Sequence, residues 1–129
     1  MTRVREIPPG DWAAFLEQFS RMHRAWLATV DRVGPDAARH VEILERPLGA
    51  VTAAVTRKQV VGIRIEFQED SRAGATLTVE GPKALRVEEA VEGTARSLEI
   101  ENVRGQRTRI RFRVPPAPDM LDGVAPGEL

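Results

Sequence analysis

Apolar residues near the start of the chain recur with the spacing of one face of an α-helix. Positions i, i+3, i+4, i+7 and i+10 are apolar, and polar residues lie between them, which predicts a helix from Asp11 to His23. Pro8, Pro9 and Gly10 end any earlier regularity, and the Asp11 carboxylate is suited to cap the first turn. We interpret the apolar face as part of the core. Its residues are Trp12, Phe15, Leu16, Phe19 and Met22.

Beyond Arg24 the apolar residues alternate with polar ones for roughly ninety residues, which is typical of strands with one buried and one solvent-facing side. Short segments rich in turn-forming residues separate the alternating runs. The predicted strands are Ala25–Val33, Arg39–Arg46, Gly49–Thr56, Val60–Gln68, Ala75–Glu80, Lys83–Glu89, Ala95–Asn102 and Arg107–Val114.

No helical pattern separates these strands, so a βαβ arrangement is disfavoured. The sequence predicts a mainly β (α+β) fold, in which one N-terminal helix packs on a curled antiparallel sheet or small barrel of about eight strands. We expect Trp12, Phe15, Phe19 and Trp26 to join the helix to the sheet. The residues predicted to face inward from the strands are Trp26, Val30, Val41, Ile43, Val51, Ala53, Val55, Val61, Ile63, Ile65, Phe67, Leu77, Val79, Leu85, Val87, Leu98, Ile100, Ile110 and Phe112.

The last two strands form the clearest predicted hairpin, because both alternate strictly between apolar and charged residues. Pairing apolar with apolar residues also brings opposite charges together on the other face, where each exposed pair contributes less than ~1 kcal/mol. The predicted pairs are Ile100–Ile110, Leu98–Phe112, Glu99–Arg111 and Glu101–Arg109.

Composition bounds the class of protein. The chain has 129 residues, 19 basic and 19 acidic side chains and no Cys, which fits one domain over residues 1–114 followed by a Pro/Gly-rich, flexible tail over 115–129. The absence of Cys excludes disulfides and thiolate chemistry. No stretch approaches the ~20 apolar residues needed to cross a bilayer, so we expect a cytoplasmic protein without a membrane partner.

Candidate catalytic chemistry is sparse. We interpret His23 as a charge at the C-terminal end of the helix and His40 as a surface residue, and we predict no catalytic residue, cofactor or metal site. The enzyme alternative is a cleft between the helix and the mouth of the sheet, where His23, Glu88 or Glu89 acts as acid or base. Two acidic clusters are interpreted as solvated strand ends and turns. They are Glu66, Glu69 and Asp70, and Glu88, Glu89 and Glu92.

Four arginines alternate along the last strand and project from one face if Ile110 and Phe112 point inward. They lie ~7 Å apart, a spacing that suits a row of phosphates or another anionic partner. Glu99 and Glu101 oppose this interpretation, because each is expected to neutralise an arginine. The arginines are Arg107, Arg109, Arg111 and Arg113.

One further pattern extends over most of the chain, from Ile7 to Phe112. It consists of Ile7-Pro8, Trp12, Phe15, Phe19-Ser20, His23, Trp26-Leu27, Pro47-Leu48, Pro82, Glu88-Glu89, Leu98-Glu99-Ile100-Glu101, Gly105, Thr108 and Arg111-Phe112. This set resembles an uncharacterised bacterial family of small single-domain proteins, a domain of unknown function, and the resemblance implies no activity, cofactor or site. The helix-then-meander order with Arg104-Gly105 near the last hairpin is also similar to Sm-like barrels, although the strands here are too many.

These observations favour a non-enzymatic binding or assembly domain. Strand edges that no neighbour covers are suited to pair with a second copy, so we expect a homo-oligomer formed through an outer strand. The alternative function is binding of a nucleic acid or an acidic partner through the arginine-rich face of the last strand.

Overall fold

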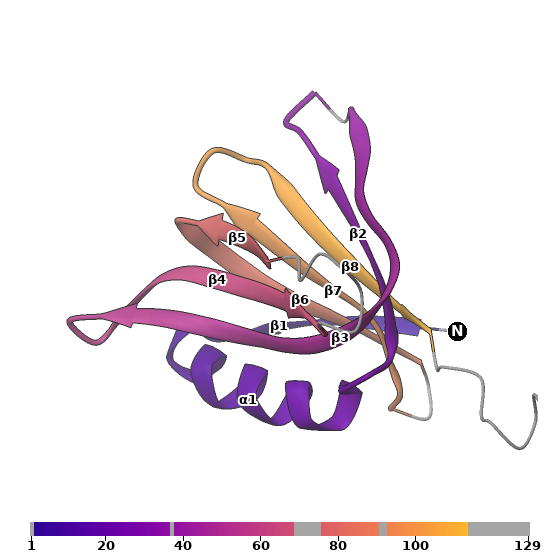
Figure 1. Cartoon of the computed structure of the whole chain (residues 1–129). Coiled ribbons are helices and arrows are strands. Elements are labelled where there is room, and N and C mark those ends of the chain that lie inside the picture. The colour runs from indigo at the N-terminus through magenta and orange to yellow at the C-terminus, as the bar shows by residue number, and fades with distance from the viewer. Residues whose placement is uncertain (1, 37, 69–75, 91–92, 114–129) are drawn as a thin grey trace, which may run out of the picture.

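The computed structural model describes residues 2–36, 38–68, 76–90 and 93–113. Within these ranges one α-helix packs against one eight-stranded antiparallel sheet (Figure 1). The sheet order is β1-β6-β7-β8-β2-β3-β4-β5, and every neighbouring pair is antiparallel. The elements are β1 (Thr2–Ile7), the 3-10 helix η1 (Pro9–Asp11), α1 (Trp12–His23), β2 (Leu27–Val33), β3 (Arg39–Thr56), β4 (Gln59–Phe67), β5 (Thr76–Glu80), β6 (Pro82–Ala90), β7 (Ala95–Asn102) and β8 (Arg107–Arg113).

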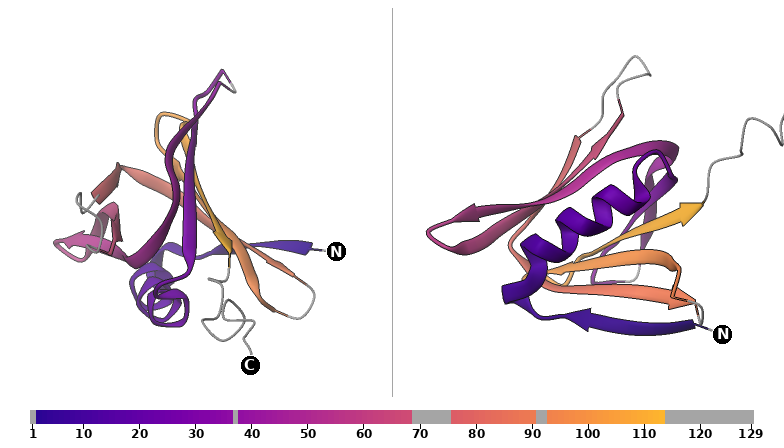
Figure 2. Two further views of the ribbon diagram at one scale, coloured as in Figure 1. Left: turned by 45° about the vertical axis from the view of Figure 1, so that its right-hand side comes forward. Right: turned by 90° about the horizontal axis from the view of Figure 1, so that it is seen from below.

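The predicted fold class is confirmed, and the sheet is curled but not closed, with β1 and β5 at its edges. The helix lies across the inside of the curl, between the β3–β5 part and the part that contains β1, β6 and β7 (Figure 2). Two hairpins, β2–β3 and β3–β4, extend beyond the layer that the helix covers (Figure 1). The helix therefore covers one end of the curled sheet, and the opposite end of the sheet lies away from the helix.

Strand β3 differs most from the prediction. Arg39–Arg46 and Gly49–Thr56 are parts of one strand, and the predicted break at Pro47 is wrong. The strand bends through an irregularity in which Glu45 takes a positive φ of 46°. The Thr29 hydroxyl accepts the Glu45 N–H at 3.1 Å, so the bulged backbone is satisfied without ending the strand.

The first strand was not predicted. Residues Thr2–Ile7 show no apolar alternation, and every residue before Ile7 is exposed. The strand exists because its backbone pairs with β6, with Ile7 opposite Leu85 and Thr2 opposite Ala90. The remaining predicted strands begin and end within two residues of the observed ones where both ends are described. The predicted tail, 115–129, lies outside the described residues.

The helix begins at Trp12, but the predicted cap is wrong. Asp11 makes no side-chain capping hydrogen bond, because it closes the 3-10 turn η1 and therefore has φ −101° and ψ −2°. A capping side chain needs an extended backbone to reach back to the first turn. The turn is held instead by the backbone hydrogen bond from Asp11 N–H to the Pro8 carbonyl, 2.9 Å long.

The core lies between α1 and the inner face of the sheet. Leu16 is fully buried on the helix, and Trp12 and Phe19 are almost fully buried. Phe15 packs against this core while partly exposed, and Trp26 is half-buried, so these four predicted helix-to-sheet residues contribute unequally. The buried residues from the strands are Ile7, Ala28, Val30, Leu48, Val51, Ile63, Ile65, Phe67, Val79, Leu85, Val87, Ala95, Leu98, Ile100 and Ile110.

Four residues predicted to face inward are exposed. Val41, Val55 and Val61 lie on the two projecting hairpins, where the alternation continues although no described part of the chain covers these side chains. Met22 is 64% exposed. In the last turn of the helix the buried side chain is that of His23. Alternation thus gives the face of a residue but not whether that face is covered.

The predicted β7–β8 register is wrong by two residues. Leu98 pairs with Ile110, and Glu99 pairs with Arg109. A shift of two keeps every side chain on its own face, so the apolar alternation excludes neither register, although the observed one places Ile100 opposite Thr108. The turn decides between them. Asn102 Oδ1 accepts the backbone N–H groups of residues 104 and 106, each at 3.0 Å. The predicted pairs that the structure replaces are Ile100–Ile110, Leu98–Phe112, Glu99–Arg111 and Glu101–Arg109.

Candidate ligand-binding groove

A groove of about 540 Å³ lies between α1 and the ends of β6 and β7. Its volume is within the range of small-molecule sites, ~300–1,000 Å³. The helix contributes one wall, Trp26 follows the helix, and β1 and β6 contribute the opposite wall. The lining residues are Arg5, Phe15, Gln18, Phe19, Met22, His23, Trp26, Val87, Glu89, Gly93, Thr94 and Ala95.

His23 is the titratable group of the helix wall, and it is 5% exposed. Its ring stacks on Phe19, with ring centroids 4.0 Å apart, and it contacts the edge of Trp26 at 4.7 Å. Phe112 of β8 approaches to 5.4 Å from the sheet. Burial among these rings lowers the pKa of His23 from its ordinary 6.5, and a hydrogen bond to the Phe19 carbonyl acts in the opposite direction.

The tautomer of His23 follows from its hydrogen bond. Nδ1 lies 2.9 Å from the Phe19 carbonyl oxygen, which can only accept, so Nδ1 carries the proton. Nε2 is therefore an acceptor in the neutral ring, and it has no partner among the described residues. A side-chain nitrogen that lacks a partner is either fully buried or reachable by solvent. Among the described residues Arg32 Nε is of the first kind, and His23 Nε2 is of the second. Since His23 lines the groove, Nε2 is available to a ligand there.

The turn after the helix holds this arrangement in place. Ala25 takes a positive φ of 71°, which is strained for a residue with a Cβ atom. Its N–H donates to the Leu48 carbonyl at 2.9 Å, and the Trp26 N–H donates to the His23 carbonyl at 3.0 Å. These bonds fix Trp26 against the His23 ring.

The opposite wall carries an ion pair. Arg5 of β1 donates from Nη2 to Glu89 of β6 at 3.1 Å, and Arg3 lies 3.7 Å from the same carboxylate. The Arg5 guanidinium also lies 5.8 Å from the centre of the Phe15 ring. Of these three charged residues only Arg5 and Glu89 line the groove, and they pair with each other, so the groove is an apolar slot with a paired polar rim.

The enzyme alternative placed His23, Glu88 or Glu89 in such a cleft, and the structure brings two of them to the groove. His23 and Glu89 both line it. Glu88 is engaged elsewhere, since it accepts the hydroxyls of Thr2 at 3.1 Å and Ser97 at 3.0 Å. His40 is exposed, as predicted. His23 lies in the last turn of the helix, as predicted, but its interpretation as a charge there is wrong, because aromatic rings cover it and its burial disfavours the charged form.

The four arginines of β8 all have carboxylate partners. Arg107 and Arg109 share Glu99, at 3.9 and 3.7 Å. Arg111 binds the buried Asp31 of β2, from Nε at 3.0 Å. The fourth, at position 113, donates twice to Glu45, at 3.2 and 2.9 Å.

The pair at the end of β8 changes the titration of both partners. The Arg113 guanidinium lowers the pKa of Glu45, and Glu45 raises the pKa of Arg113.

The sequence prediction did not include Asp31 among the partners of these arginines. In the β2–β8 pairing Thr29 lies opposite Arg111 and Asp31 lies opposite Arg109, so Asp31 is a neighbour of Arg111 on the same face of the sheet.

The acidic clusters do not form a second centre within the described residues. Glu66 lies 3.5 Å from Arg64, whereas Glu69, Asp70 and Glu92 lie outside the described residues. The part of the chain that the structure describes contains no group of three or more His, Asp or Glu placed to hold a metal ion. It also contains no helix long and apolar enough to cross a bilayer.

The groove residues that the sequence did not single out are mainly Arg5, Gln18 and Thr94. Gln18 could have been identified from its place beside Phe15 and Met22 on the helix surface. Arg5 and Thr94 carry no such signal, because they reach the groove through the pairing of β1 with β6 and the connection before β7.

Comparison of the sequence with protein-family models finds no matching model. Neither the curated proteins nor the solved structures give a significant match.

Proposed function

We propose that this protein is a non-enzymatic binding domain that holds a small, mainly apolar ligand in the groove beside α1. The observation that carries the proposal is the Nε2 of His23, an acceptor that has no partner among the residues described and is held in place within an aromatic slot of about 540 Å³. Apolar pockets with a few fixed polar groups are typical of small-molecule sites, in which the polar groups set orientation.

The geometry favours a ligand with a flat apolar body and one O–H or N–H donor. Phe15, Phe19 and Trp26 supply ring contacts, and Met22 supplies an adaptable thioether beside them. The donor of the ligand would bond to Nε2. A charged ligand is disfavoured, because the nearby Arg5 and Glu89 already satisfy each other at 3.1 Å.

The test uses two probes that differ by one donor, 2-naphthol and naphthalene, in two-dimensional NMR titrations of the whole protein. We expect the indole N–H signal of Trp26 to shift on saturation. The Trp12 signal should stay, because its Nε1 donates to the Ile7 carbonyl at 2.8 Å in the core. We also expect 2-naphthol to bind several-fold more tightly than naphthalene, and the variant His23→Phe to abolish that difference while keeping a flat ring.

Two matched variants locate the binding. Met22→Glu puts a charge on the rim of the groove, and Val41→Glu puts the same charge on an exposed valine of the β2–β3 hairpin. We expect about a tenfold loss of affinity for the first, equivalent to ~1.4 kcal/mol, and none for the second. Equal losses in both variants, or the absence of saturable shifts at Trp26, would overturn the proposal.

Self-association through strand edges stays a prediction. Its candidates are β1 and β5, the two edges of the sheet. Of these, β1 carries Arg3, Arg5 and Glu6, and charged edge residues usually discourage pairing. Sedimentation over a wide concentration range tests the prediction, and a monomer throughout that range would contradict it.

A further inference from the structure

A second pocket, of about 380 Å³, lies at the end of the curled sheet away from α1. Its walls come from the end of β2, from β5 and from the turn between β7 and β8. Unlike the helix groove, it is lined mostly by polar groups. The residues that matter here are Arg32, Thr78, Glu80, Asn102, Arg104 and Thr108.

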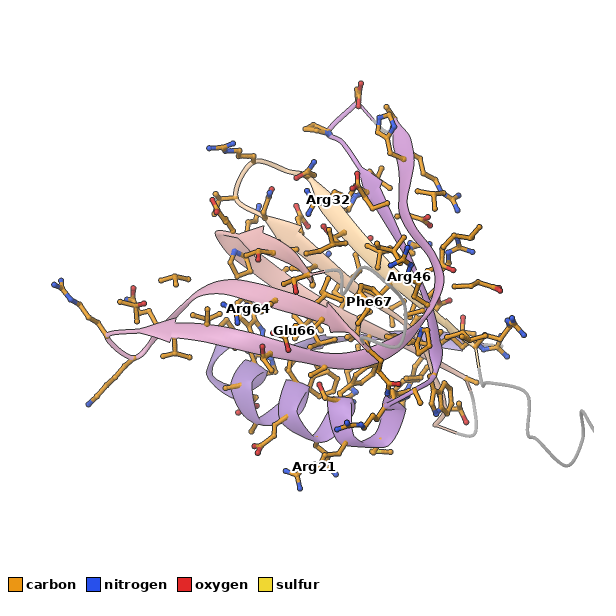
Figure 3. The ribbon with its side chains drawn as sticks, in the orientation of Figure 1. Arg21, Arg32, Arg46, Arg64, Glu66 and Phe67 are labelled. Carbon is orange, nitrogen blue, oxygen red and sulfur yellow. The ribbon has the colours of Figure 1, made fainter. Side chains whose placement is uncertain are left out.

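Arg32 faces the inside of the sheet because of strand alternation. Ala28 and Val30, on the same side of β2, are fully buried core residues. Arg32 continues this row, directly opposite the buried Thr108 of β8. Figure 3 shows Arg32 on the part of the sheet that lies away from α1. The guanidinium of Arg32 therefore lies on the inner face of the curled sheet.

This guanidinium has few partners. Nη2 donates to the Thr78 carbonyl at 3.4 Å, a long bond, and Nε is buried without a partner in the part of the chain that the structure describes. No carboxylate within the described residues pairs with Arg32. Most other arginines of these residues have one, as Arg39 and Arg111 have at Asp31. A buried donor without an acceptor is costly, and an acceptor that reaches the guanidinium removes that cost.

The surroundings favour an anion rather than a neutral molecule. Arg104 lines the same pocket, and Glu80 is its single acidic residue, so the lining carries one excess positive charge. Glu80 forms no ion pair with Arg32 or Arg104. The wall is preorganised, since Asn102 fixes the β7–β8 turn and the Val103 N–H donates to the Gly81 carbonyl at 2.9 Å.

We propose that this pocket binds a small molecule or ion through an oxyanion, a phosphate or carboxylate, held side-on by the guanidinium of Arg32, so that the buried Nε gains the acceptor that it lacks among the described residues. A planar guanidinium offers two parallel donors that match two oxygens of such a group. The Thr108 side chain, opposite Arg32 in the β2–β8 pairing, flanks the bound group. This site is independent of the helix groove, with which it shares no lining residue.

The test titrates the full chain with inorganic phosphate, and separately with malonate, at constant ionic strength set with sodium chloride. Backbone NMR shifts at residues 78–81 and 102–108 report the site, and the melting temperature reports stabilisation by a bound ligand. We expect saturable binding of at least one anion with a Kd of ~1 mM or lower. Comparing the two anions distinguishes a phosphate site from a carboxylate site.

Arg32→Gln should weaken that binding at least tenfold and remove the rise in melting temperature. The control Arg96→Gln makes the same change of charge at an exposed arginine of β7 and should bind like the parent protein. Arg32→Lys keeps the charge but loses the paired donors, so we expect an intermediate loss, which also covers the case in which Arg32→Gln fails to fold. Equal binding by the parent and Arg32→Lys or Arg32→Gln, or no saturable shift with either anion at ~10 mM, would overturn the proposal.

Discussion

Removal of the Phe19 ring tests both the core and the groove. Phe19 is 5% exposed and lies between three other rings. Its centroid is 5.7 Å from Phe15, 4.0 Å from His23 and 5.2 Å from Phe112. The substitution Phe19→Ala therefore removes a side chain through which the helix meets β8.

The loss in free energy of unfolding depends on what happens to the space that the Phe19 ring leaves. Truncation of a buried Phe to Ala costs about 3–5 kcal/mol, of which part is the cavity left behind. Phe19 lines the helix groove, so the space would open to water rather than stay sealed. We therefore expect the lower end, about 3 kcal/mol, including the lost stacking on His23 that contributes ~1 kcal/mol. A loss of this size lowers the melting temperature by roughly 10 °C.

Urea unfolding followed by the fluorescence of Trp12 and Trp26 measures this effect, with far-UV circular dichroism as a second probe. Phe19→Leu keeps most of the volume and should lose only ~1 kcal/mol, which keeps the test possible if the alanine variant does not fold. Met22→Ala is the control, because its side chain is 64% exposed and should change stability by less than ~0.5 kcal/mol. A free energy of unfolding for Phe19→Ala within 1 kcal/mol of the parent value would refute the helix–sheet packing described above.

Three further outcomes are expected. Burial lowers the pKa of His23 in the folded state, so the unfolded chain takes up a proton first as the pH falls, and stability should decline from about pH 6.5 down to the folded pKa. Urea midpoints measured across this range should show that decline in the parent protein and less of it in His23→Phe. Lys58→Gly should stabilise the protein by roughly 0.5–1 kcal/mol in thermal melts, because Lys58 holds a φ of 66° in a two-residue turn, and a lower melting temperature would contradict this. Because the arginines of β8 are all paired with carboxylates, gel-shift assays with RNA and DNA should show no retention even at low salt, and retention that Arg109→Ala reduces would count against this expectation.

Local sequence patterns predicted the elements but not their partners. The spacing from Trp12 to Phe19 and the alternation of β4 to β8 depend on neighbours along the chain, so the helix and most strands were predicted. Strand β1 and the β7–β8 register depend instead on pairing across the sheet, which apolar alternation does not encode.

In the candidate sites, too, local sequence indicates some residues, whereas their surroundings depend on segments that are distant along the chain. A cleft beside the helix was considered only as part of the enzyme alternative, and the burial of His23 in it depends on Phe112, which comes from the other end of the described chain. Arg32 could have been recognised from its place two residues after Val30, since that alternation turns it inward. Its lack of a carboxylate partner could not be predicted, because it depends on where β5 and the β7–β8 turn lie.

The strand order also has a consequence for how the chain folds. The helix, β2 and β3 can form early, but β2 stays without its second neighbour until β8 has been made, because β8 pairs with residues near the opposite end of the described chain. The same is true of β1, which waits for β6. Such non-local pairing slows folding through the entropy of closing long loops. We therefore expect folding on the millisecond-to-second timescale, completed only after β8 leaves the ribosome, with the β2 edge as the segment exposed to aggregation until then.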